Sequence, residues 1–223
     1  MCARSEPLQV AAIGQDILQR LEITNLARDR ALNEGRQIVR LSANTVRAVH
    51  RRDIGEAHQL LEKARTLLDG LTRSLSELPA IRWAGYVQDA MKEFAEASIT
   101  LSIVAGRALP RPADLSIDDA PYLNALAESA SELRRSTLDA LRSGDFEEAE
   151  RYLEIMDEVY SFLVTVDFPD GITGGLRRTT DALRAVLERT RGDLTITGAQ
   201  NRLHSALERA NAVQSPASPT TEP

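Results

Sequence analysis

The sequence has little of what several common protein classes require. It contains one cysteine, Cys2, so it can form neither a disulfide framework nor a thiolate metal site. Aromatic residues make up 4% of the chain and β-branched runs are short, which argues against a sheet-rich fold. No charged leader with a following apolar segment opens the sequence, and the most apolar stretch, Ile99 to Ala105, is too short to span a bilayer. We therefore expect a soluble, cytoplasmic protein with no membrane segment.

The common catalytic motifs are also missing. The chain has no Gly-rich phosphate loop and no HExxH pair, and its three histidines, His50, His58 and His204, lie far apart. The net charge is −6, so the protein as a whole does not attract a polyanion such as nucleic acid. A bound nucleic acid would therefore need a local basic surface.

What the sequence does have is the composition and periodicity of helices. Ala, Leu, Arg and Glu dominate, and apolar residues recur at three- and four-residue spacing. The predicted helices cover residues 15–52, 53–78, 81–107, 122–142, 146–166, 172–191 and 196–211. Because the connections are short, we predict an all-α fold, a seven-helix antiparallel bundle.

Helix-capping and helix-breaking residues set the predicted boundaries. Asp53 is a typical N-cap for the second helix, and Pro79 closes that helix. Gly192 and Asp193 separate the last two predicted helices. The predicted organisation is a flexible N-terminus over 1–14, one helical domain over 15–212 and a disordered tail rich in Ser, Pro and Thr over 213–223.

Basic residues form a stripe on the first predicted helix. Arg36, Arg40, Arg47 and Arg51 advance by four, seven and four residues, so they fall within about 60° on the helix surface, and His50 and Arg52 extend the stripe. A row of guanidinium groups can follow phosphates without reading bases. The alternative is an ordinary solvated face whose arginines pair with Glu34 and with acids of neighbouring helices.

Acidic residues gather on the third and fourth predicted helices. Glu93 and Glu96 are three residues apart, with Asp89 one turn earlier, and Glu128 and Glu132 are four apart in an apolar setting. Carboxylates from two helices suit Mg²⁺ or Mn²⁺, which could activate water against a phosphodiester. The alternative is a set of ordinary surface glutamates neutralised by Lys92 or nearby arginines.

Ordered blocks of this sequence resemble the translin/TRAX family of nucleic-acid-binding proteins, over Arg28 to Asn211. The resembling segments are RDRALNEGRQIVRLSANTVRAVHRR, AMKEFAEA, YLNALAESASELRR, SGDFEEAERYLEIMDEVYSFL, VDFPDGITGGLRRTTDALR and RTRGDLT. In TRAX, the glutamate pair of the second block and acidic residues of the third form a metal-dependent ribonuclease site. Animal translin lacks the pair and binds without cutting.

The resemblance carries roles onto individual residues. Glu93 and Glu96 match the glutamate pair, Glu132 matches the family glutamate, and Glu128 stands where the family has aspartate. The resemblance thus implies a Mg²⁺-dependent endoribonuclease for single-stranded RNA, and possibly single-stranded DNA, with Glu93, Glu96 and Glu128 catalytic and Glu132 a fourth metal ligand. It also implies a translin-like homo-oligomer, an octameric shell, with Arg36, Arg40, Arg47, His50 and Arg51 binding nucleic acid.

Two other functions fit the same sequence. One is a translin-like shell that binds single-stranded DNA or RNA without cutting it, and the other is a helical scaffold that binds no nucleic acid. Base preference is not encoded in the arginine stripe, and only Trp83, Tyr86 and Phe94 lie near the acids as candidate stacking platforms. For Trp83 and Phe94 we expect mainly core roles.

Overall fold

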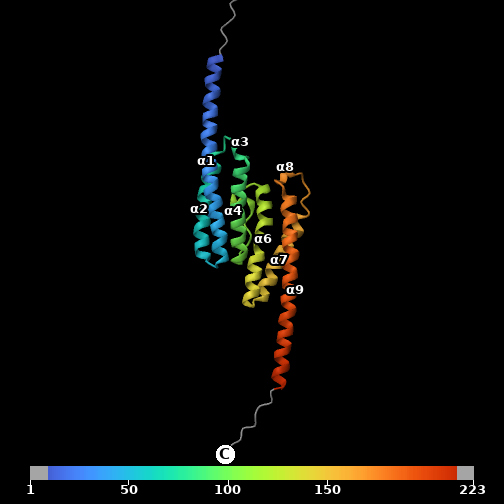
Figure 1. Cartoon of the computed structure of the whole chain (residues 1–223). Coiled ribbons are helices and arrows are strands. Elements are labelled where there is room, and N and C mark those ends of the chain that lie inside the picture. Colours follow the sequence, from blue (N-terminus) through green and yellow to red (C-terminus); the bar gives the residue numbers. More distant parts are fainter. Residues whose placement is uncertain (1–9, 215–223) are drawn as a thin grey trace, which may run out of the picture. The chain divides into compact units, whose positions relative to one another are not determined.

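The computed structural model describes residues 10–214, and within them the chain is helical with no strand. The all-α prediction is therefore confirmed. The described residues form nine helices (Figure 1). Their contacts divide the chain into two units, Met1–Leu126 and Ala127–Pro223, which are described in turn. The predicted flexible N-terminus and disordered tail lie largely outside the described residues.

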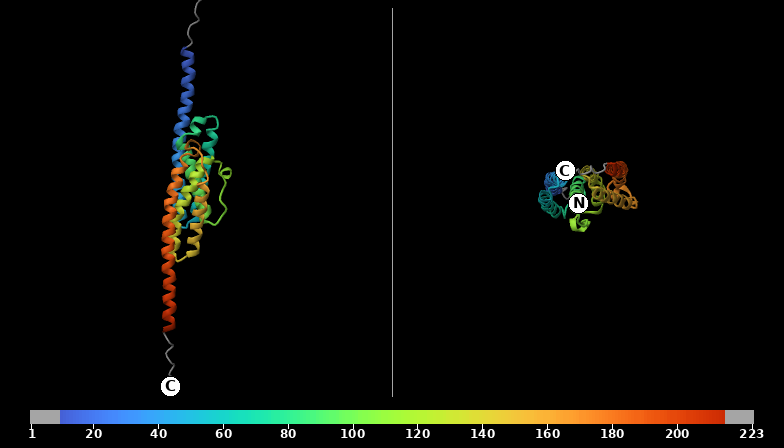
Figure 2. Two further views of the ribbon diagram at one scale, coloured as in Figure 1. Left: turned by 90° about the vertical axis from the view of Figure 1, so that its right-hand side faces the viewer. Right: turned by 90° about the horizontal axis from the view of Figure 1, so that it is seen from below.

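Unit 1 is built on three long helices. Its elements are α1 (Val10–His50), α2 (Ile54–Ser74), α3 (Pro79–Arg82), α4 (Gly85–Val104), α5 (Pro112–Leu115) and the beginning of α6 (Asp119–Ser143). The second part of α1 packs against both α2 and α4, and α2 also contacts α4. The left view in Figure 2 shows the first part of α1 extending beyond these neighbours.

The turn between α1 and α2 follows from its residues. Arg52 adopts a left-handed conformation (φ 62°), which ends α1, and the Asp53 side chain accepts a hydrogen bond from the backbone nitrogen of Glu56. The two helices thereby become antiparallel neighbours, with Val49 of α1 and Ala57 of α2 in a shared buried cluster. The predicted Asp53 cap is confirmed.

Gly35 brings α1 close to α4. A Cβ atom at this position would lie 3.4 Å from the backbone oxygen of Tyr86 and 3.8 Å from the Cβ of Ala90. A glycine here lets the two backbones approach closely. Gly35 is buried, as are most α4 residues that face this contact.

The predicted third helix is divided in the structure. Pro79 begins α3 in addition to ending the preceding segment, because a proline is well tolerated at the first helical position. A turn at Trp83 and Ala84 separates α3 from α4. The prediction of one helix over 81–107 is therefore wrong at its start.

Unit 2 contains the rest of α6 together with α7 (Phe146–Leu163), α8 (Asp170–Thr173) and α9 (Leu176–Gln214). Asp145 caps α7 by accepting from the backbone nitrogen of Glu148. Helices α7 and α9 pack together, and Ala140, Ala149 and Leu194 form a buried cluster.

The predicted break at Gly192 is wrong, because α9 runs through it without interruption. A single glycine costs a helix only about 1 kcal/mol relative to alanine. Tertiary ion pairs hold the helix on both sides of that glycine: Arg191 pairs with Asp157, and Asp193 pairs with Arg134. Asp193 therefore contacts another helix instead of capping a new one.

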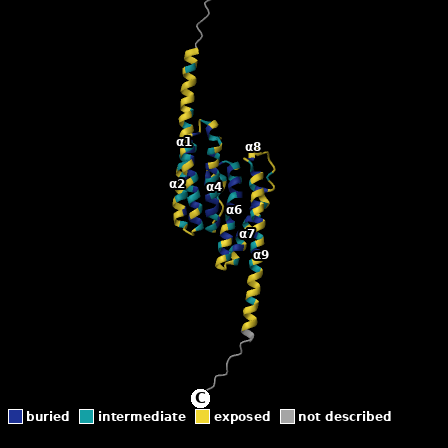
Figure 3. Ribbon diagram, viewed as in Figure 1, coloured by how far each residue is buried: buried dark blue, intermediate teal, exposed yellow. Residues whose placement is uncertain are grey.

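Exposed segments are concentrated in the first part of α1 and the last part of α9 (Figure 3). On α1 these include large apolar side chains, among them Ile13, Ile17 and Leu21. None of the helices within residues 10–214 has an apolar stretch of the length needed to cross a membrane.

Candidate metal centre and nucleic-acid interface

Helix α4 presents its two glutamates on one side, flanked by the buried Ala90 and Ala97, and its largest core residues on the other. Glu93 and Glu96 are three residues apart, so they lie on the same face, and both are half-buried. Phe94 and Met91, on the opposite side, are 1% and 0% exposed. Because its core face is fully packed, α4 holds the glutamate pair in a fixed direction.

Contacts within unit 1 hold the start of α6 against the end of α3 and the start of α4. The Nη2 of Arg82 donates to both carboxylate oxygens of Asp118, at 3.0 and 3.2 Å, and the Gln88 amide donates to the same carboxylate at 3.4 Å. The Tyr122 hydroxyl donates to the carbonyl of Pro110 at 2.8 Å. Burial, followed by the charge of Asp114, raises the pKa of Tyr122, so the hydroxyl remains a protonated donor.

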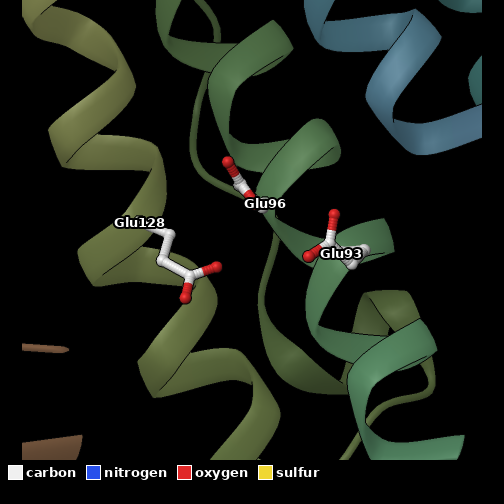
Figure 4. Close-up of side chains that lie close together, drawn as sticks. All are labelled: Glu93, Glu96 and Glu128. Atoms are coloured by element: carbon white, nitrogen blue, oxygen red, sulfur yellow. The ribbon is translucent and has the colours of Figure 1, made fainter. Parts of the chain in front are cut away.

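Glu128 extends from α6 toward the α4 pair. The helix is continuous across the boundary between the units, and Glu128 lies six residues beyond Tyr122. One carboxylate oxygen from each of Glu93, Glu96 and Glu128 lies within 4.8 Å of the others (Figure 4). These three residues are called the glutamate cluster below. Glu132, one turn further along α6, is half-buried and lies outside this cluster.

The donor set of the cluster suits a hard divalent cation. Two oxygens bound to one Mg²⁺ are about 3 Å apart when adjacent and about 4 Å apart when opposite. Oxygens within 4.8 Å of one another need move less than about 2 Å to reach those separations, and a glutamate side chain has enough rotatable bonds for such a movement. The three residues could therefore hold Mg²⁺ or Mn²⁺.

Lys92 is a cation that lies beside the cluster. Its Nζ lies 3.2 Å from Oε1 of Glu93 and 3.6 Å from Oδ1 of Asp89. The Lys92 side chain is 20% exposed and that of Glu93 is 25% exposed. This contact is the one that the alternative of neutralised surface glutamates predicted.

The arginine stripe lies on the solvent side of α1. Arg36, Arg40 and Arg47 are exposed, whereas the buried residues of this helix, such as Ile38 and Val49, lie on the opposite side. Arg51 and Arg52 are also exposed but follow the end of the helix. His50, the last helical residue, is half-buried.

The stripe is paired with acids only in part: Arg51 pairs with Glu56 of α2, as the alternative of an ordinary charged face predicted. Glu34 pairs with Arg30 at 2.7 Å and not with a stripe residue. Among the described residues, Arg36 and Arg40 form no ion pair. Arg47 donates to the side chain of Asn44 at 2.7 Å, which leaves its charge uncompensated by an acid.

The aromatic residues near the acids separate into two groups. Phe94 is 1% exposed, which confirms its predicted core role. Trp83 is 59% exposed, so the core role predicted for it is wrong. It lies in the turn between α3 and α4.

The residues that hold α6 near α4 were not found from the sequence. Arg82 and Asp118 are 36 positions apart, and neither belongs to a local pattern. The only available signal was the polar content of the segment that follows Pro110 and Pro112, which is typical of any loop.

The chain is similar to known proteins in both sequence and structure. No family model matches the chain. An uncharacterised protein of Methanocaldococcus jannaschii is 31% identical over 186 residues, which are 82% of this chain and 81% of that protein. The solved complex of AfC3PO with duplex RNA is 33% identical, with a TM-score of 0.78, and covers 83% of this chain and 96% of its own.

Two further solved structures agree with this result. A crystal structure of AfC3PO is 32% identical, has a TM-score of 0.78 and covers 83% of this chain and 97% of its own. Apo-NeC3PO is 18% identical, with a TM-score of 0.71, and covers 87% of this chain and all of its own. At that identity, the likeness to apo-NeC3PO is one of fold.

Proposed function

This chain belongs to the translin/TRAX family, as a C3PO-type protein, and from that premise we propose that it is a metal-dependent endoribonuclease acting on single-stranded RNA. The observation that carries the proposal is the convergence of Glu93, Glu96 and Glu128 to within 4.8 Å from two helices. Three converging oxygen donors can hold the divalent cation that metal-assisted phosphodiester hydrolysis uses.

The glutamates would hold the cation and handle the proton. A bound Mg²⁺ or Mn²⁺ supplies a Lewis acid that polarises the phosphodiester and lowers the pKa of a coordinated water. One carboxylate of the cluster accepts the proton that the attacking water loses, and no covalent intermediate with the protein forms. The three glutamates are half-buried, which limits the access of bulk water to their carboxylate oxygens.

Glu128 is longer by one methylene than the aspartate that the family has at this position. Its oxygen reaches the same 4.8 Å neighbourhood as those of Glu93 and Glu96, so the longer arm is compatible with a shared ligand set. Glu132 lies outside the cluster, and in this proposal it binds the metal indirectly, through a water molecule.

The arginine stripe would bind the phosphates. Arg36, Arg40 and Arg47 are exposed on one face of α1, and at least two of them have no acidic partner among the described residues. His50 and Arg51 extend this surface at its end, although Arg51 also pairs with Glu56. Such contacts bind RNA and single-stranded DNA alike, because they involve phosphates and not bases.

A homo-oligomer, in the form of an octameric shell, completes the proposal. Val10, Ile13, Ile17 and Leu21 lie on one side of the first part of α1, and all of them are more than 40% exposed. An exposed apolar stripe of this kind marks a surface that another protein chain covers. A second copy of the chain is the partner that a homo-oligomer requires.

The test is cleavage of end-labelled single-stranded RNA by the purified protein with Mg²⁺, with Mn²⁺ and with EDTA. We expect fragments of intermediate length with either metal and intact RNA with EDTA. The proposal fails if RNA is bound but remains intact under every metal condition, or if cleavage continues unchanged in EDTA.

A second candidate is a non-catalytic translin-like protein that binds single-stranded DNA or RNA. The observation that favours it is the contact of Lys92 with Glu93 at 3.2 Å, because an ammonium ion can take the place of a metal. The same cleavage experiment separates the two candidates: the second predicts salt-sensitive binding without any metal-dependent product.

A further inference from the structure

Trp83 is an exposed aromatic side chain in a position that the fold holds firmly. It is the only tryptophan in the sequence and is 59% exposed. Its backbone nitrogen donates to the carbonyl of Pro79 at 3.0 Å, and the following residue, Ala84, donates to Ile81. The turn that carries the ring is therefore fixed at both sides.

Arg82 covers one face of this ring. Its guanidinium carbon lies 5.5 Å from the ring centroid, and the same group is anchored by Asp118 at 3.0 Å. The Arg82 side chain is only 22% exposed, so the cation is held between the ring and the protein. The guanidinium lies over one face of the ring, and the residue as a whole is 59% exposed, so we take the opposite face as the one available to a ligand.

We infer that Trp83 is a stacking platform for one unpaired nucleobase of the bound strand. This inference rests on the proposed nucleic-acid function and names a second type of contact, one with the base and not the phosphate. Base stacking on an aromatic ring needs an open face and a ring that does not move, and the Arg82 and Asp118 contacts supply the second condition.

The platform lies toward the Arg36 end of the arginine stripe. Helix α3, which ends one residue before Trp83, contacts α1. Three residues after Trp83, the backbone oxygen of Tyr86 lies against Gly35, the neighbour of Arg36. Trp83 and Arg36 therefore belong to contacting elements of the same unit, and a strand that touches both is part of this proposal.

A base must be unpaired to stack on Trp83, so the platform should prefer single-stranded RNA to duplex RNA. In a duplex both faces of each internal base are occupied by its neighbours, so the ring has access only to terminal pairs. In a single strand any base can turn out and stack. Trp83 thus favours single-stranded over duplex RNA without distinguishing one sequence from another.

Because Trp83 is the sole tryptophan, its fluorescence reports on this contact directly. The parent protein is titrated in EDTA with three ligands: a single-stranded RNA, the same RNA annealed to its complement, and a ribose-phosphate strand of equal length without bases. Binding is followed separately by the anisotropy of a labelled copy of each ligand. We expect strong quenching by the single strand at saturation, weak quenching by the duplex and none by the strand without bases.

Variants measure the contribution of the platform to affinity. Trp83→Ala should weaken binding of the single strand by about 5- to 150-fold, the range for the loss of one stacked base, and should leave the strand without bases unaffected. Trp83→Phe should restore most of the loss. Phe168→Ala is the matched control, since Phe168 is 63% exposed and lies outside α3 and α4.

The outcomes separate this inference from the function on which it rests. Unchanged emission at saturation, with anisotropy reporting binding, overturns the platform and leaves the nucleic-acid function standing. Equal loss of affinity for the strand without bases also overturns it. If no ligand changes the anisotropy, the proposed function fails and the platform fails with it.

A contact between copies of the chain would give a different signal. In that case the emission would shift to shorter wavelength as the protein concentration rises, with no RNA present, because the ring would leave water. That result would assign Trp83 to an interface and overturn the platform.

Discussion

The glutamate cluster and the arginine stripe are both sets of like charges, but they are built in different ways. Arg36, Arg40 and Arg47 of the stripe lie on one helix, are exposed and share a face through the period of α1 alone. The cluster takes residues from α4 and α6, is half-buried and exists only because two helices meet. A surface that binds phosphates can be built from one exposed helix face, whereas a catalytic site requires residues that converge from different helices.

This difference extends to what each set of charges costs the protein. Exposed arginines are screened by water and salt, so the stripe costs the fold little. Half-buried carboxylates within 4.8 Å repel one another more strongly and need compensation, which Lys92 supplies to Glu93 in part. A divalent cation bound by the three carboxylates would offset the same repulsion.

The largest expected effect comes from neutralising the cluster. Glu93→Gln and Glu128→Gln should each lower the rate of RNA cleavage by about 10³-fold, because each removes a charged ligand and leaves the shape nearly unchanged. Binding of single-stranded RNA should change by less than about threefold. Single-turnover cleavage and anisotropy of the same RNA measure the two quantities.

The matched control for these variants is Glu158→Gln, which neutralises an exposed glutamate on α7 outside the cluster. Cleavage by this variant should equal that of the parent. If Glu93→Gln and Glu128→Gln also cut as fast as the parent, the glutamate cluster has no part in the reaction.

The next effect tests whether the cluster depends on tertiary anchoring. Asp118→Ala removes the acceptor of Arg82 and Gln88 and frees the start of α6, so the ligand geometry should loosen. A misplacement of about 1 Å can cost about 10²-fold in rate, and we expect a loss of about 10- to 100-fold. Raising the Mn²⁺ concentration should recover part of that loss, which would not occur if the variant were simply unfolded. Circular dichroism checks the helical content.

A smaller effect is expected from the stripe, and on a different quantity. Replacing Arg36, Arg40, Arg47 and Arg51 together by alanine should weaken RNA binding by at least about tenfold at physiological salt. It should also lower the slope of log affinity against log salt by about 3, since each phosphate contact with a single strand contributes about 0.7. The cleavage rate at saturating RNA should stay the same.

Lys63→Ala is the control for the stripe, since Lys63 is an exposed cation on α2. Its salt slope should match that of the parent. A quadruple variant whose slope is also unchanged would show that RNA binds elsewhere, and the exposed arginines would then be an ordinary solvated face.

The smallest effect is expected at Glu132. It lies one turn beyond Glu128 but outside the cluster, so Glu132→Gln should lower cleavage by less than about tenfold, against about 10³-fold for Glu128→Gln. The ratio of the two cleavage rates, measured in parallel at limiting Mn²⁺, shows whether Glu132 binds the metal directly. Equal losses would place Glu132 among the direct ligands.

The helices and their faces could be read from the sequence because they depend on local periodicity. The caps at Asp53 and Asp145 form as their residue types require. The same local reasoning failed at Gly192, where contacts of Arg191 and Asp193 with other helices hold α9 continuous. It failed again at Trp83, whose exposure is set by the turn between α3 and α4 and not by its hydrophobicity.

The sequence alone determined that the chain is helical, that arginines line one face of α1 and that Glu93 and Glu96 share a face of α4. Each of these follows from the 3.6-residue period of a helix. Only the tertiary structure decided that Glu128 meets that pair while Glu132 lies apart, and that Trp83 remains open to solvent. The physical reason is that helical periodicity fixes the direction of a side chain about its own axis, whereas convergence depends on long-range contacts such as that of Arg82 with Asp118.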